Sequence, residues 1–326
     1  MPGTQGVSGG LLSTFDVGSF GYNTGAGFIA NQEDLSDVVT ILDSFQTPLF
    51  SSAPKIRATD PVHSWTVDTL AATSTAGVIE GVDFSGDTLT SSTRLFNVTQ
   101  IFSRHVLVSD RERAARPAGI RDMYEHQIMK EFKNIARNCE ARLFAVNSTG
   151  TASGAEAATN APLMAGLRGF GISTSVSASG TVTTADICTL SQTLFENGAE
   201  PDSIWFAPAS KRQFVNATVL SGSGNVRNIA ATDQRLVANI DVFETPFNQL
   251  YAVITDRFIP IAAASNLGNG YYIGDRAMAK IAFFRPPQHK PMGKSGDHTR
   301  GIVLMECTLH LDHPSSWAAM SGVINT

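Results

Sequence analysis

The chain has 326 residues, enough to bury a sizeable core as one large domain or as two closely packed ones. Charged residues make up only 16% of it, and the net charge of −5 argues against a protein that wraps nucleic acid directly, because neutralising phosphates requires a basic excess. Three cysteines without a close pair exclude a disulfide framework, and no apolar run approaches the roughly 20 residues of a membrane helix. We therefore expect a protein without membrane contact that stays in the cytoplasm where it is made.

The first 30 residues hold eight glycines and a single charged residue, Asp16. Four aromatic residues are scattered among the glycines: Phe15, Phe20, Tyr22 and Phe28. Glycine makes this stretch costly to order, yet aromatic side chains would be wasted in a purely disordered tail. We therefore expect an arm that becomes ordered against a neighbour, with the four aromatics as its anchors. A short helix is expected over residues 34–42, followed by a break at 46–48.

An acidic segment comes next, because residues 58–93 carry five acids and neither Lys nor Arg. Alternating residues at 64–67 and 88–90 predict two strand arms joined by a glycine-containing tip at 77–86. A hairpin of this length with so few large apolar residues cannot hold itself rigid in water, so it should lie against another surface. Residues 97–109 then predict one strand.

The strongest periodic signal lies between residues 118 and 147, where apolar residues recur at steps of three or four. They are Ile120, Tyr124, Ile128, Phe132, Ile135, Cys139, Leu143 and Val146. The pattern predicts one face of a long helix, with Pro117 in its first turn and a stop at 147–150. At about 1.5 Å per residue this helix would span roughly 45 Å.

The second half of the chain reads as an α/β insertion followed by returning strands. Residues 149–184 predict mostly loop with one or two short strands, and helices are expected at 185–197 and 210–220. Short buried strands are expected at 204–207 and 241–243. Further strands are predicted at 251–255, 270–273, 278–284 and 302–311.

Motifs that could carry chemistry are weak. The nucleophile-elbow pattern at 6–10 has no buried strand before it, and the glycines at 21–27 likewise lack the strand of a dinucleotide site. The Gly-Lys-Ser at 293–295 lacks the earlier glycine of a phosphate loop. Near the C-terminus four potential metal ligands gather: Cys307, His310, Asp312 and His313. Strand alternation points Cys307 away from His310 and Asp312, so we expect no metal site here. Because the other motifs also lack their structural context, we expect no catalytic site and no cofactor.

Charge is segregated by element, because residues 104–142 hold nine basic side chains against six acids. One hypothesis is that the acidic hairpin lies over this segment in a neighbouring subunit. Its acids would be Asp68, Glu80, Asp83 and Asp87, and its bases Arg121, Lys130, Lys133, Arg137 and Arg142. The alternative is two solvated faces that never meet, since charge runs are usually just solvated.

Several stretches carry a family resemblance: SDVVTILDSFQTPLFSSAPKIRATDPVHSWTVDTLAAT, EGVDF, NVTQIFSRHVLVSD, EFKNIARNCEARLF, IWFAPASKRQFV and GKSGDHTRGIVLMECTLHLD. Over most of residues 34–312 the chain resembles the tailed-bacteriophage major capsid family, in a subfamily related to that of the podovirus SU-ten. The resemblance implies an α+β chain with the Hong Kong 97-like capsid fold. Its parts would be an N-terminal arm (1–57), an extended loop (58–99), a peripheral domain (100–185 and 270–326) with a spine helix at 118–147, and an axial domain (186–269). Residues 313–322 depart from the family pattern.

By the same resemblance the chain would be a structural protein and not an enzyme. Copies of it would form pentamers and hexamers of an icosahedral shell, assembled in the host cytoplasm, that encloses double-stranded DNA without sequence-specific binding. Scaffolding, portal and decoration proteins would be its further partners. Some relatives weld the shell through a lysine–asparagine isopeptide bond, but this chain has no lysine between Lys55 and Lys130, which predicts that no such bond forms.

Three alternatives remain open at this point. An encapsulin-like nanocompartment shell shares the fold but encloses enzymes. A hydrolase-type enzyme would need a convergent nucleophile, base and oxyanion arrangement, which the sequence does not reveal. A tail or adhesion protein should show repeats or a strand-dominated chain, and the long predicted helix argues against it.

Overall fold

The computed structural model describes residues 46–71, 73, 75, 77, 79–81, 91–115, 120, 122–145, 161–177, 180–217, 240–260 and 269–323. The chain divides into two compact units, and of the first, residues 1–40 and 118–120, only Ile120 is described. Every helix and strand named below belongs to the second unit, residues 41–117 and 121–326. The predicted aromatic anchors of the arm and the predicted helix at 34–42 lie outside the described residues.

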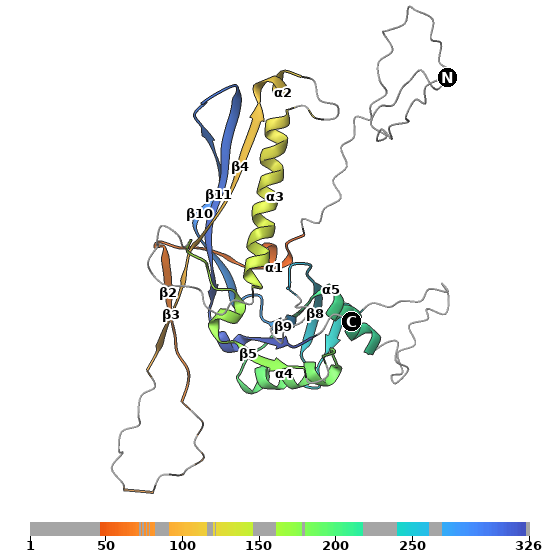
Figure 1. Ribbon diagram of the computed structural model, residues 1–326. Coiled ribbons are helices and arrows are strands. Elements are labelled where there is room, and N and C mark those ends of the chain that lie inside the picture. The colour runs from red at the N-terminus through yellow and green to blue at the C-terminus, as the bar shows by residue number, and fades with distance from the viewer. Residues whose placement is uncertain are drawn as a thin grey trace, which may run out of the picture. The chain divides into compact units, whose positions relative to one another are not determined.

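A four-stranded sheet in the order β1-β10-β11-β4 carries helix α3 against one face (Figure 1). Its strands are β1 (Lys55–Arg57), β4 (Gln100–Ser109), β10 (Ala279–Met292) and β11 (His298–Leu311). Strands β10 and β11 are longer than predicted and form an antiparallel pair, whereas β1 runs parallel to β10 along three residues. Beyond Phe283 the register of β10 shifts at Pro286 and Pro287. Proline is tolerated here because β1 has ended and this part of β10 is a sheet edge. Without an amide hydrogen, the prolines also discourage pairing with a strand of another molecule.

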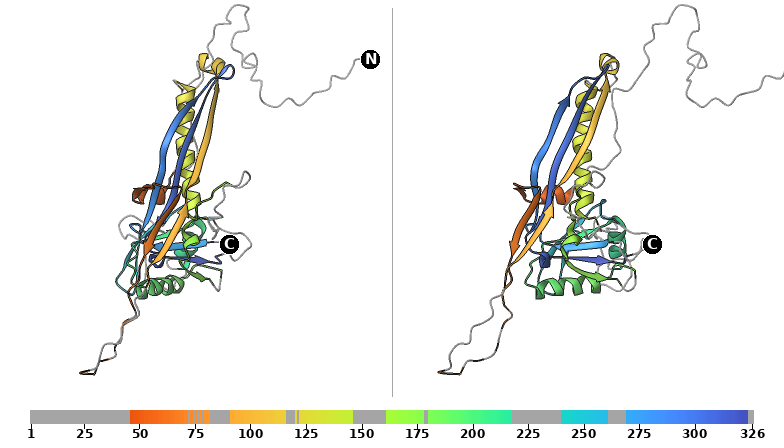
Figure 2. Two further views of the ribbon diagram at one scale, coloured as in Figure 1. Left: turned by 90° about the vertical axis from the view of Figure 1, so that its left-hand side faces the viewer. Right: turned by 60° about the vertical axis from the view of Figure 1, so that its left-hand side comes forward.

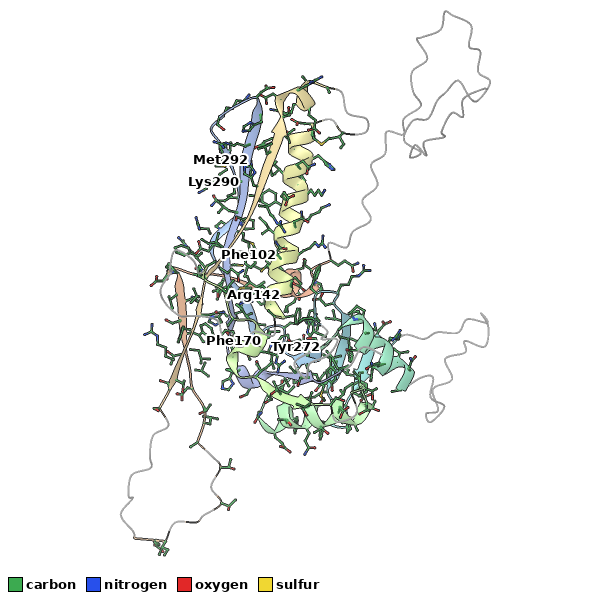
Figure 3. All side chains as sticks on the ribbon, in the orientation of Figure 1. Phe102, Arg142, Phe170, Tyr272, Lys290 and Met292 are labelled. Carbon is green, nitrogen blue, oxygen red and sulfur yellow. The ribbon has the colours of Figure 1, made fainter. Side chains whose placement is uncertain are left out.

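Helix α3 (Met123–Leu143) confirms the predicted periodic stripe but is shorter than predicted. Asp122 is its N-cap and accepts a hydrogen bond from the amide of Tyr124 at 2.8 Å, so the start predicted at Pro117 is wrong. Its 21 residues span about 32 Å instead of 45 Å. The stripe packs on β4 and β11, and Figure 3 shows Phe102 of β4 on the side of the sheet that faces the helix. The short helix α2 (Asp110–Ala114) joins β4 to the segment before α3.

Strands β2 (Val62–Val67) and β3 (Thr93–Val98) form an antiparallel two-stranded sheet. Strand β2 confirms the first predicted arm of the hairpin, but its observed partner is β3, and the predicted second arm at 88–90 lies outside the described residues. The single strand predicted at 97–109 is wrong, because the chain passes from one sheet to another at Thr99. The Thr99 amide donates to Pro61 O at 2.8 Å, and its hydroxyl donates to the Glu306 carboxylate at 2.7 Å.

A six-stranded sheet has the order β5-β12-β9-β6-β8-β7. Its strands are β5 (Ser173–Val176), β6 (Ser203–Phe206), β7 (Val242–Glu244), β8 (Leu250–Thr255), β9 (Asn269–Gly274) and β12 (Trp317–Ser321). The short 3-10 helices η2 (Leu167–Phe170) and η4 (Pro314–Ser316) precede β5 and β12. The strand predicted at 241–243 exists as β7, but it lies at the sheet edge with two of its three residues exposed, so the prediction that it is buried is wrong.

Two helices accompany this sheet, and Figure 2 shows α4 running along it. Helix α4 (Thr184–Glu196) confirms the prediction at 185–197, and a reciprocal capping box between Thr183 and Asp186 fixes its start. Helix α5 (Pro208–Val215) begins with proline in its first turn, two residues earlier than predicted. No helix in the described ranges is both long and apolar enough to cross a membrane.

The six-stranded sheet separates two buried clusters, because its side chains alternate between its faces. Trp205 and Tyr272 point into the larger cluster with α3, while the adjacent Phe206 and Tyr271 point into the smaller cluster with α4 and α5. Trp317 packs across Gly274, where even a methyl group would collide with the indole ring. The larger cluster thus packs the four-stranded sheet, α3 and one face of the six-stranded sheet together.

Candidate functional site

The β2–β3 hairpin presents a surface that is both acidic and apolar. Every described residue from Asp68 to Gly81 is exposed, including Leu70 at 99% and Ile79 at 77%. Large apolar side chains this exposed are candidates for contact with another surface. Of the acids predicted to make contacts, Asp68 and Glu80 are exposed here, while Asp83 and Asp87 lie outside the described residues.

The base of the hairpin, by contrast, is firmly seated on the rest of the subunit. Trp65 donates its indole N–H to Leu311 O at 2.9 Å, and its ring lies 5.6 Å from that of Phe170. The buried Asn97 donates to Leu309 O at 2.8 Å and accepts from Ala165 N at 2.9 Å. The hairpin therefore leaves the subunit from a fixed base and exposes what lies beyond it.

A chain of polar side chains lies beside this base. His63 Nε2 is 2.8 Å from His310 Nδ1, and His310 Nε2 is 2.7 Å from Asp312 Oδ1. Because Asp312 accepts from Nε2, the neutral His310 ring offers Nδ1 as an acceptor to His63. Burial lowers the pKa of both histidines, although Asp312 partly opposes this at His310. At neutral pH both rings are therefore uncharged and hold β2 to β11.

The predicted alternation at the end of β11 is confirmed. Cys307 points into the core, where its sulfur lies 3.6 Å from that of Cys139, while His310 and Asp312 face the hairpin. Burial and the neighbouring thiol raise the pKa of Cys139 well above its ordinary value. Both thiols are thus buried core groups.

The basic residues predicted to make contacts on α3 occupy different surroundings. Lys130 and Lys133 are exposed, and Arg137 lies over the ring of Phe258 at 5.7 Å. Arg142, near the C-terminal end of α3 in Figure 3, donates to Met164 O at 2.9 Å, and burial lowers its pKa. Arg142 therefore serves its own chain, and Arg121 lies outside the described residues.

Within the described part of the chain, no ion pair joins Asp68 or Glu80 to α3. The structure thus does not bring the acidic and basic sets together inside one subunit. Whether they meet between subunits is a question about assembly.

One polar site was missed by the sequence reasoning. Helix α1 (Pro48–Ser52) lies where the sequence predicts only a break, and Glu140 of α3 accepts hydrogen bonds from two amides in the first turn of α1, those of Leu49 at 2.8 Å and Phe50 at 2.6 Å. At the other end of α1, Lys55 Nζ donates to the carbonyls of Phe50, Ser51 and Ala53. The one sequence signal for this contact was a glutamate directly beside Cys139, a residue of the apolar stripe.

Comparison with known proteins gives concordant results. Residues 21–323 match the family described as SU10 major capsid protein. The major capsid protein of Escherichia phage Phieco32 is 22% identical over an alignment of 335 positions that covers 88% of this chain and 92% of that relative. Among solved structures, a chain from Mycobacterium phage Bobi matches with a TM-score of 0.60 and 10% identity, covering 89% of this chain and 95% of the other. The capsid structure of cyanophage P-SCSP1u matches with a TM-score of 0.57 and 13% identity, covering 89% and 92%.

The two sheets, the long helix and the projecting hairpin define the subunit of a viral shell with the Hong Kong 97-like capsid fold, as the resemblance implied. Because the family match spans more than nine-tenths of the sequence, this chain belongs to the SU10 major capsid protein family. It is a phage major capsid protein, and its place is the capsid of the virion.

The encapsulin fold is related. The holo-SrpI encapsulin of Synechococcus elongatus PCC 7942 matches with a TM-score of 0.54 and 12% identity, covering 88% of this chain and 94% of the other. At that identity the likeness shows the fold alone. The family match therefore decides in favour of the phage capsid.

Proposed function

We propose that copies of this chain assemble into pentamers and hexamers of an icosahedral shell that encloses double-stranded DNA without sequence-specific binding. The observation that carries the proposal is the β2–β3 hairpin, which has a bonded base and an exposed apolar and acidic continuation. A two-stranded hairpin is marginally stable alone in water, so its exposed part needs another surface. In a shell built from one chain, a second copy supplies that surface.

The family resemblance suggests which part of the fold each residue range forms. Residues 1–57 would be the N-terminal arm, with Phe15, Phe20, Tyr22 and Phe28 packing against neighbours, and residues 58–99 the extended loop. Residues 100–185 and 270–326 would be the peripheral domain, with α3 as its spine. Residues 186–269, which contain most of α4, helix α5 and the strands β6, β7 and β8, would be the axial domain that meets its copies at the centre of each ring.

The hairpin would lie over α3 of the adjacent subunit. Its acids Asp68, Glu80, Asp83 and Asp87 would face Arg121, Lys130, Lys133 and Arg137, while Arg142 is set aside because it bonds within its own chain. Exposed ion pairs contribute about 0–1 kcal/mol each, so charge would fix the register and the apolar residues would supply most of the affinity.

The shell would have no catalytic activity. It would also lack a lysine–asparagine isopeptide cross-link, because residues 56–129 contain no lysine. Reinforcement would come from non-covalent contacts or from a decoration protein. A scaffolding protein and a portal protein would take part in assembly in the host cytoplasm.

The test is negative-stain electron microscopy of charge-reversal variants. Lys130→Glu with Lys133→Glu should sharply reduce the yield of closed shells, and adding Asp68→Lys with Glu80→Lys should restore part of it. Lys290→Glu makes one such charge reversal on β10, away from the proposed contact, and should assemble normally. If the α3 variants assemble as well as Lys290→Glu does, the hairpin does not use this surface.

The enclosed material separates the phage shell from the encapsulin-like alternative. Particles purified from infected cells should carry double-stranded DNA. Particles that consistently contain a protein cargo in place of DNA would favour the nanocompartment.

A further inference from the structure

We propose that Glu140 and Asp256 share one proton and thereby lock helix α1 onto α3, which makes this carboxyl pair a positioning device for the C-terminal part of the proposed N-terminal arm. The lock itself is a property of one subunit. Its consequence for assembly rests on the proposed role of the arm.

The contacts of Glu140 account for the docking of α1. A helix begins with amide groups that have no partner inside the helix, and a carboxylate is the strongest acceptor for them. The two oxygens of Glu140 take the amides of Leu49 and Phe50, at 2.8 Å and 2.6 Å. Helix α1 is only five residues long and could not persist alone, so its position depends on this contact, on the burial of Leu49 and on Lys55 at its other end.

Asp256 explains how a carboxylate can be kept in this place. It follows β8 directly and is 1% exposed, and Glu140 is 0% exposed. Asp256 Oδ1 accepts from the amide of Phe258 at 2.8 Å, whereas Oδ2 is buried with no donor from elsewhere in the described residues. The adjacent carboxyl of Glu140 is the group left to share a proton with it.

Two carboxylates in contact and out of water cannot both remain ionised. Burial, reinforced by the neighbouring Asp256, raises the pKa of Glu140 to about 9. Burial also raises the pKa of Asp256. At neutral pH the pair therefore carries one proton and one negative charge.

The surrounding groups are consistent with one negative charge. Lys55 on β1 interacts electrostatically with Glu140, and α1 itself contains no charged residue. Cys139 is a neutral thiol, because burial and Cys307 raise its pKa. On the Asp256 side, Arg137 stacks on Phe258 and Arg257 is exposed.

The sign of the pH effect follows from these shifts. An acid whose pKa is raised on folding stabilises the folded arrangement most below its unfolded pKa, and that contribution is lost as the pH rises through the folded pKa. The docked state therefore weakens as the pH rises from the ordinary pKa of a carboxyl group towards about 9, and it reaches its weakest above about 9, where the second carboxyl is ionised in the docked state as well and the two charges repel. Helix α1 should then detach while the rest of the subunit stays folded.

Hydrogen–deuterium exchange of the full chain tests this directly. The labelling time is shortened tenfold for each pH unit between 7 and 10, so that an unprotected amide exchanges to the same extent at every pH. Peptides covering residues 47–53 report the α1 amides, and a peptide from α4, which does not touch the pair, is the internal control. Protection of α1 should fall by about tenfold per pH unit between 7 and 9 and level off above 9, while α4 stays unchanged.

Two variants separate a shared proton from general alkaline loosening. Asp256→Asn keeps the shape and can donate its amide to an ionised Glu140, so α1 should stay protected and its pH dependence should disappear. Glu140→Gln keeps one acceptor for the two amides and should lower α1 protection at every pH. A flat wild-type profile, or an alkaline loss that persists in Asp256→Asn, would overturn the proposal. Because exchange is read on the subunit and shell formation by microscopy, the lock and the proposed function can fail independently.

Discussion

Replacing Asn97 by alanine should loosen the seat of the hairpin. The side chain is 2% exposed and makes three hydrogen bonds to distant backbone groups, two with Ala165 and one with Leu309. At about 1 kcal/mol for each bond, and more where the abandoned backbone group stays buried, Asn97→Ala should cost about 3–5 kcal/mol.

Urea unfolding of the unassembled subunit measures this cost. The midpoint should fall while the slope stays unchanged, because the folded core keeps its surface. Asn134→Ala is the matched control, since Asn134 makes its hydrogen bond to Glu131 on the surface of α3 and should change stability by less than about 0.5 kcal/mol. If Asn97→Ala lowers the free energy of unfolding by less than about 1 kcal/mol, the hydrogen bonds of Asn97 do not hold the hairpin to the rest of the subunit.

Three further outcomes follow from the same contacts. Burial lowers the pKa of His310, so the stability of the hairpin base should be complete above the unfolded pKa of about 6.5 and decline as the pH falls. The fluorescence of Trp65, whose ring lies 4.2 Å from that of His310, should report this acid transition, and the transition should weaken in His310→Gln. Gly301→Ala should cost about 1–3 kcal/mol in thermal unfolding, because the new methyl group would meet side chains from α3 and β10, whereas Gly293→Ala, in open space, should be neutral; equal effects would contradict the packing. Cys188 should react first with a thiol reagent in the native state and the two fully buried cysteines only on unfolding; early labelling of all three would contradict the described core.

Local signals predicted the elements where local chemistry decides them. The periodic stripe from Ile120 to Val146 predicted the body of α3, the helix expected at 185–197 is α4, and alternation correctly turned Cys307 away from His310. The start of α3 was misplaced because proline in the first turn and aspartate at the N-cap both mark helix starts, and here the side-chain hydrogen bond of the N-cap Asp122 fixes the start.

Features fixed by distant contacts could not be predicted. Nothing local marks Thr99 as the point where the chain changes sheets, because its partner Glu306 lies 207 positions away. His63 and His310 are 247 positions apart, and Glu140 meets the α1 amides across about 90. Such pairs become visible only when the sheets are assembled.

Cryo-electron microscopy of particles from the full chain, produced with its candidate scaffolding protein, tests the central claim most directly. The account predicts closed icosahedral shells in which each β2–β3 hairpin lies over α3 of a neighbouring subunit. A protein that stays monomeric under every condition, or shells in which the hairpin folds back on its own subunit, would contradict it.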